Sequence, residues 1–129
     1  MSESQNNGEI RPVSLSVHQF LESGRDSLDL VLLAGGSGLE RQIREPMFHR
    51  PGLALTGFFE YFANARIQVI GMTEYAYLAS LSVADRADKI GRFMKADVPC
   101  MVFCGRTEPF EEVLTLAEEC HVPVLSTSW

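Results

Sequence analysis

Two residues that can bind an anion, His49 and Arg50, stand directly before a helix predicted to begin at the next proline. Proline suits the first helical position because its missing N–H would find no partner there. The backbone N–H groups of residues 52 and 53 and the Arg50 guanidinium can then converge on one anion. The alternative is structural, with Arg50 pairing with a nearby carboxylate, Glu45 or Glu60, to fix the entry to the helix. The sequence alone leaves both interpretations open.

A second polar pair, Thr73 and Glu74, follows Gly71 at the end of a predicted strand. Open α/β sheets bind ligands at the carboxyl ends of their strands, so both side chains are candidate ligand contacts. The alternative is a helix cap, with Thr73 as the capping residue and Glu74 in the acidic first turn. Together with His49 and Arg50, these residues form the predicted ligand-binding set.

No catalytic constellation is visible in the sequence, and we expect no catalytic residues. A nucleotide-binding P-loop requires G-x-x-x-x-G-K-[ST], a string that this chain lacks. The nearest candidate, residues 34–41, has no lysine in place and puts Glu40 where an anion would tolerate it least. We interpret it as a flexible turn.

The cysteines favour neither a metal site nor disulfides. Cys100, Cys104 and Cys120 are few and odd in number, and His121 is the only further ligand close to them. Zinc sites need three or four well-spaced ligands, so we expect no metal. Reduced thiols are typical of the cytoplasm, where we place the protein. Cys104 beside Arg106 can be mildly activated, although packing is the commoner role of such a thiol.

Length and charge exclude several function classes. The 129 residues form one domain with one core, and the net charge of −6 gives a pI near 5.0. Nucleic acids and anionic membranes attract basic surfaces, so neither is an expected partner. No apolar run approaches the length needed to span a bilayer. Residues 1–12 are polar and predict a disordered tail, which leaves 13–129 as the folded domain.

The remaining pattern predicts an α/β fold, with a small parallel or mixed sheet of three to five strands flanked by helices. Predicted strands cover residues 28–34, 67–70, 98–103 and 122–125. A helix opened by Pro109 lies between the last two strands, which indicates a right-handed βαβ unit. Two further helices begin after Ser16 and Ser82, which are good capping residues.

An aromatic stripe marks the segment that follows Arg50. Leu55, Phe58, Phe59 and Phe62 recur at i, i+3, i+4 and i+7, which predicts one face of a helix. Such a face is usually core, and the three phenylalanines are alternatively candidates for an interface between subunits.

The same residues resemble a known family, the N-terminal domain of bacterial HPr kinase/phosphorylase. Its R-P-G-L-x-L-x-G-[FY]-F-x-[YH]-F pattern fits residues 50–62, R-[IV]-Q-[VI]-[IL]-G fits 66–71, and T-E-x-x-[YF]-L fits 73–78. The family's G-L-x-R-x-I pattern fits residues 38–43. The resemblance therefore runs, in order, from about residue 15 to residue 127.

The resemblance carries several expectations. The fold should be similar to the substrate-binding domains of muramyl peptide ligases. The family's kinase and phosphorylase chemistry, which acts on a serine of the carrier protein HPr in the control of carbon metabolism, belongs to a separate P-loop domain. ATP and Mg²⁺ are therefore expected only with that domain, and HPr only as an indirect partner. We expect a non-catalytic regulatory or assembly domain that forms a homo-oligomer and contacts the catalytic domain. The alternative function is a stand-alone sensor of a nucleotide or sugar phosphate.

Overall fold

The computed structural model describes residues 14–45, 47–60 and 62–129 and has the expected α/β architecture. The predicted tail, residues 1–12, lies outside the described residues. A five-stranded mixed sheet has the strand order β2-β7-β6-β5-β4, and only the β2–β7 pair is antiparallel. The strands of this sheet are β2 (Val31–Ala34), β4 (Phe48–His49), β5 (Ile67–Ile70), β6 (Met101–Phe103) and β7 (Val124–Ser126).

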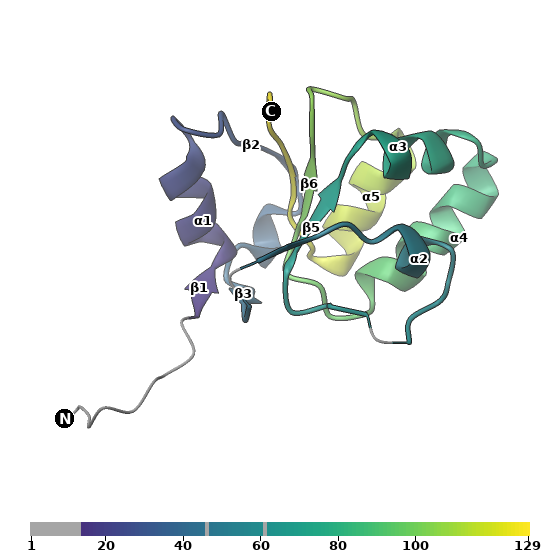
Figure 1. The fold of residues 1–129 in the computed structure, drawn as a ribbon, viewed down its shortest axis with the longest axis horizontal. Coiled ribbons are helices and arrows are strands. Elements are labelled where there is room, and N and C mark those ends of the chain that lie inside the picture. The colour runs from purple at the N-terminus through teal and green to yellow at the C-terminus, as the bar shows by residue number, and fades with distance from the viewer. Residues whose placement is uncertain (1–13, 46, 61) are drawn as a thin grey trace.

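Helices cover both faces of the sheet, unequally (Figure 1). Four helices pack on one face: α2 (Gly52–Leu55), α3 (Met72–Ala79), α4 (Val83–Met94) and α5 (Glu111–Cys120). Among the described residues, the other face carries α1 (Val17–Gly24) and an antiparallel pair, β1 (Leu15–Ser16) with β3 (Gln42–Ile43). The longer helices therefore bury one side of the sheet more completely than the other.

Alternation along the strands creates two separate cores. Ile70, Met101 and Phe103 point into the helical core, where they meet Ile90 and Phe93. Their neighbours on the strands point the other way, toward α1. This second core contains Val17, Leu21, Ile67, Cys100, Val102 and Leu125.

The predicted βαβ unit is confirmed, because β6 and β7 are parallel and α5 connects them. The predicted first strand was too long. It begins at Val31 because Asp29 adopts a left-handed conformation with φ 54°, which interrupts extended backbone. The resulting β2 lies at one edge of the sheet, and β4 lies at the other.

The predicted aromatic helix is wrong beyond its first turn. Helix α2 ends at Leu55, because Gly57 has a φ of 102°, which no helix continues through. Phe59 and Phe62 still pack against the helical core, but Phe58 is 51% exposed. A regular helical face therefore does not connect these rings.

Helix caps match the prediction at two helices and differ at two others. The Ser16 hydroxyl accepts from the Gln19 N–H, and the Ser82 hydroxyl accepts from the Asp85 N–H, as expected. Helix α3 is capped at Gly71, so Thr73 lies inside its first turn rather than before it. Helix α5 begins at Glu111, two residues after the proline that was expected to open it.

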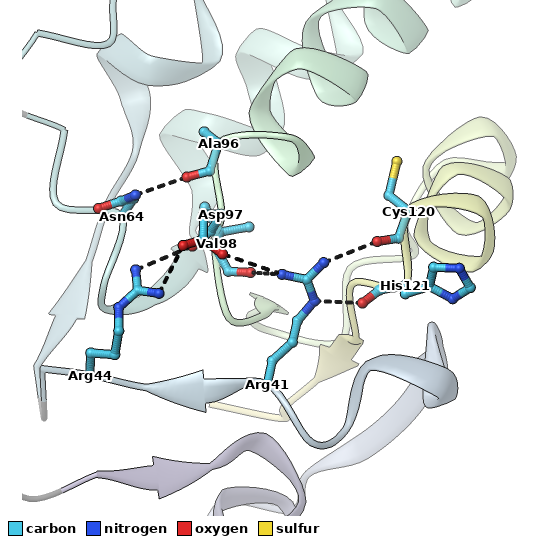
Figure 2. A network of polar contacts seen from close by, with 8 residues as sticks. All are labelled: Arg41, Arg44, Asn64, Ala96, Asp97, Val98, Cys120 and His121. Carbon is cyan, nitrogen blue, oxygen red and sulfur yellow. Dashed lines mark hydrogen bonds and ion pairs between the residues drawn. The ribbon is translucent and has the colours of Figure 1, made fainter.

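Two arginines that flank β3 close the end of the sheet at which the parallel strands begin, which we call its amino edge (Figure 2). The Arg41 guanidinium donates to the carbonyls of Val98, Cys120 and His121, at 3.2, 3.1 and 2.6 Å. Arg44 pairs with Asp97 at 3.0 Å. These contacts tie β3 to the segments that enter β6 and β7, so their role is structural. The opposite, carboxyl edge of the sheet is where the predicted site residues lie.

None of the described helices is both long and apolar enough to cross a membrane.

Candidate functional site at the carboxyl edge

The predicted ligand-binding residues lie at or shortly after the ends of two neighbouring strands, at the same edge of the sheet. Strand β4 ends at His49 and is followed by Arg50, while the adjacent parallel strand β5 ends at Ile70, just before Gly71. Strand β6 is next to β5 and is followed by Cys104. Parallel neighbours end at one edge, which is where open α/β sheets place ligands.

Arg50 and Glu74 form an ion pair across this edge. The Arg50 Nε donates to Glu74 Oε1 at 2.9 Å. The Glu74 side chain is 6% exposed, whereas that of Arg50 is 56% exposed. Arg50 therefore pairs with a carboxylate, as the structural interpretation expected, but the partner is Glu74 and not Glu45 or Glu60. Glu45 pairs with Arg66 instead, at 2.9 Å.

Gly71 makes this pairing fit. The Gly71 N–H donates to the same Oε1 of Glu74, also at 2.9 Å, so one buried oxygen caps helix α3 and holds Arg50. A Cβ at position 71 would stand 2.8 Å from Arg50 Nη2. A side chain there would displace the guanidinium, because real Cβ contacts are not this short. The three residues form one unit, which we name the Arg50–Glu74 cap.

The cap weakens the case for an anion at this position. Glu74 Oε2 lies 3.9 Å from the place of a Cβ on Gly52, so a carboxylate already stands beside the start of α2. It offsets the charge of Arg50. Thr73 is exposed in the first turn of α3 and is not part of the cap.

A groove of about 260 Å³ lies beside the cap, between β4 and the segment after α2. His49 and Phe62 form one wall, with ring centroids 5.6 Å apart. Leu53 and Phe58 are more than half exposed at its rim, and Glu60 also lines it. The groove thus combines two of the predicted site residues with two of the predicted interface residues, Phe58 and Phe62.

His49 should make folding sensitive to mild acid. Burial, and then the charge of Arg66, lower the pKa of His49 below its ordinary value of 6.5. The unfolded chain therefore takes up a proton at a higher pH than the folded protein. Stability from this residue is complete above pH 6.5 and is lost as the pH falls through the lowered pKa. In urea melts from pH 7.5 to 5, we expect H49Q to lose less stability than the original chain. The melt at pH 7.5 controls for packing, and equal slopes would refute the expectation.

The surroundings of Cys104 do not favour an activated thiol. Burial raises its pKa, an effect that Arg50 opposes and Glu74 reinforces. Arg106, the expected activator, pairs with Asp29 instead. No group of three or more potential metal ligands occurs in the described ranges, 14–45, 47–60 and 62–129.

Sequence reasoning missed the exposed apolar side chains around β4. Met47 and Phe48 are 56% and 59% exposed, and Leu53 is 68% exposed. A lone apolar residue looks the same in sequence whether it is buried or exposed, so no signal marked them. The one available hint was that the predicted sheet needs two edges.

The model of the family described as "HPr Serine kinase N terminus" matches residues 15–129. The chain belongs to this family. Members named HPr kinase/phosphorylase include a protein of Caldicellulosiruptor bescii, 42% identical over 101 residues, which are 78% of this chain and 32% of the relative. The relative in Treponema pallidum (strain Nichols) is 43% identical over 103 residues, or 80% and 32% of the two chains.

A more distant member extends the match. The HPr kinase/phosphorylase of Geobacter sulfurreducens is 33% identical over 118 residues, covering 92% of this chain and 37% of the relative. The chain therefore spans about a third of the length of these relatives. The family assignment agrees with the resemblance seen in the sequence motifs.

Proposed function

We propose that this chain is a non-catalytic assembly domain of the HPr kinase/phosphorylase type, with a regulatory role through subunit contacts. The observation that carries the proposal is the exposed apolar surface at the β4–α2 edge. Leu53 and Phe58 are each more than half exposed there, and both line one groove. Exposed apolar side chains gathered in this way mark protein interaction sites. Phe48 is also more than half exposed, but it lies on the other face of the sheet with the second core.

The glycine-rich turn supports a non-catalytic role. Glu118 Oε2 accepts the Gly35 N–H at 2.8 Å, so a carboxylate stands where a P-loop would hold phosphate. Gly36 to Gly38 form a tight 3₁₀ turn packed on the end of α5 rather than a flexible loop. ATP, Mg²⁺ and contact with HPr would then belong to another part of the enzyme. In this proposal the catalytic domain and further copies of the chain are its direct partners.

The alternative function, sensing of a nucleotide or sugar phosphate, has less support. Glu74 offsets the positive charge of Arg50, and Glu60 adds a negative charge to the same groove. A phosphate there would meet the Glu60 carboxylate and a guanidinium that Glu74 already neutralises. Nucleotides and sugar phosphates that left the melting temperature unchanged would fit the assembly role, because ligands that bind the folded state raise it.

Sedimentation of the purified chain tests the proposed assembly. We expect a mass above 14.4 kDa that increases with protein concentration. The double variant L53S/F58S should sediment closer to a monomer while its urea melt stays near that of the original chain, since both side chains are exposed. The matched control is V31S, an exposed apolar residue on β2 at the opposite edge of the sheet.

Two results would contradict the proposal. A strictly monomeric chain at all concentrations would remove assembly by this domain alone. If V31S caused dissociation and L53S/F58S did not, the interface would lie at the β2 edge instead. The non-catalytic part is tested separately with Mg-ATP and HPr, where phosphoserine above background would refute it.

A further inference from the structure

The face of the sheet that carries α1 contains an apolar pocket that is distinct from the groove beside the Arg50–Glu74 cap. Its volume is about 160 Å³, and ten of the residues that the structure describes line it. Strands β5 and β6 supply the floor through Val69 and Val102, α1 contributes Phe20, and Phe48 and Trp129 stand at the mouth. The pocket lies toward the carboxyl ends of the parallel strands, where sheets of this class bind ligands.

The pocket exists because α1 is too short to cover its face of the sheet. Eight residues give a helix of about 12 Å, and it ends at Gly24. Phe48 and Trp129, beyond the reach of this helix, remain 59% and 74% exposed. Large aromatic side chains at the mouth of an apolar cavity are unfavourably hydrated until something covers them.

Hydrogen bonds hold the mouth of the pocket open. The Trp129 indole Nε1 donates to the Ser27 carbonyl at 3.1 Å, and the Trp129 carbonyl accepts from the Gly105 N–H at 2.7 Å. The Thr127 hydroxyl, a polar group of the lining, donates to the Leu28 carbonyl. The ring of Trp129 is therefore anchored at a fixed place, and the pocket is formed before any ligand arrives.

We propose that this pocket binds a small apolar molecule of about the size of one ring, such as a monocyclic aromatic or a short branched aliphatic compound. An apolar cavity of about 150 Å³ accepts a benzene-sized ring, which fits the volume here. Among the lining residues that the structure describes, none has a charged side chain, so a phosphate or sugar would lose its hydration there without compensation. A stable protein interface needs about 20–30 residues a side, whereas the pocket is lined by ten residues of the described part of the chain.

The unique tryptophan reports on the pocket directly. Trp129 is the only tryptophan in the chain, so its fluorescence comes from the mouth of this site. Titration with toluene should shift its emission to shorter wavelength and saturate, because the ring displaces water from the indole. Benzoate, the same ring with a charge, should produce no saturable shift. V69F, which fills the pocket from a half-buried position, should lose the response to toluene. V31F, on exposed β2, should keep it.

Thiol labelling tests the same pocket without any variant. Cys104 lines the pocket and is half-buried, whereas Cys120 is equally half-buried but lies on α5. Toluene should slow alkylation of Cys104 by iodoacetamide and leave Cys120 unchanged. No saturable shift together with unchanged labelling overturns the proposal. If V69F instead lowers the sedimenting mass, the occupant is a second copy and the small-molecule proposal is wrong. Leu53 and Phe58 are not among the lining residues of the pocket, so the sedimentation of L53S/F58S tests the proposed assembly separately from these two measurements.

Discussion

Replacing Arg86 with methionine should lower the free energy of unfolding by about 3 kcal/mol. Arg86 is 8% exposed in the middle of the helical layer. It donates to the carbonyls of Leu78 and Leu81, at 2.8 and 2.9 Å, and so caps the end of α3 from α4. It also pairs with Glu112 of α5 and stacks on the Phe110 ring at 3.9 Å. Methionine keeps much of the stem but removes the donor of the Glu112 carboxylate and the Leu81 carbonyl, and it leaves the Leu78 carbonyl with the longer bond from the Leu81 N–H, at 3.2 Å.

Urea melts of R86M and R92M give this prediction its control. Arg92 lies on the same helix, but its pair with Asp88 is exposed on both sides, so R92M should change stability by less than about 1 kcal/mol. Equal melts for the two variants would show that the buried arginine is no more important than a surface one.

Acid provides a second measurement of the Arg86 contact. The hydrogen bond from Arg86 is the main cause that lowers the pKa of Glu112 below 4.5. This carboxylate therefore stabilises the fold above pH 4.5, and its contribution is lost as the pH falls through the lowered pKa. R86M should show a shallower loss of stability in that range, because the cause of the shift has been removed.

The sequence predicted elements whose signals are local. The strand from residue 67, the helix between the last two strands and the strand that ends at residue 103 each carry an apolar period that needs no distant partner, although this last strand begins at Met101 and not at residue 98. The failed aromatic helix had the right period, but Gly57 interrupts it with a positive φ. A period alone does not show where the backbone turns. The burial of Arg86 also had a signal in the sequence, because Arg86 is spaced i, i+4 and i+7 with Ile90 and Phe93, which are buried on the same helix.

The candidate site was predictable in its residues and not in its pairing. Arg50 and Glu74 were both selected, each with a local explanation, and they lie 24 residues apart. Their contact depends on β4 pairing in parallel with β5, which places both at the carboxyl edge. The apolar pocket was out of reach for a similar reason. It arises because α1 is shorter than the sheet face on which it packs, and the size of that face depends on how distant strands assemble.

The glycine turn after β2 should be sensitive at one glycine and tolerant at another two residues away. A Cβ on Gly38 would stand 1.9 Å from the His121 carbonyl oxygen, which is backbone and cannot rotate away. Gly38→Ala should therefore destabilise the fold by about 3 kcal/mol, at the upper end for overpacking. A Cβ on Gly36 would meet only Leu32 Cδ2, at an ordinary 3.5 Å. Gly36→Ala should be neutral or stabilise by about 0.4–1 kcal/mol, through lost freedom of the unfolded chain.

The Gly38 effect should spread to the amino edge of the sheet. The His121 carbonyl that a Cβ would push is the one that accepts from Arg41 Nε at 2.6 Å. Moving it also disturbs the left-handed turn at His121, with φ 56°, between α5 and β7. Hydrogen exchange of G38A should therefore speed up at the N–H of Val122, which donates to Ala117, and G36A should leave it protected. Equal urea melts for G38A and G36A would mean that the turn can move aside without loss of stability. The close packing around position 38 would then not explain why a glycine stands there.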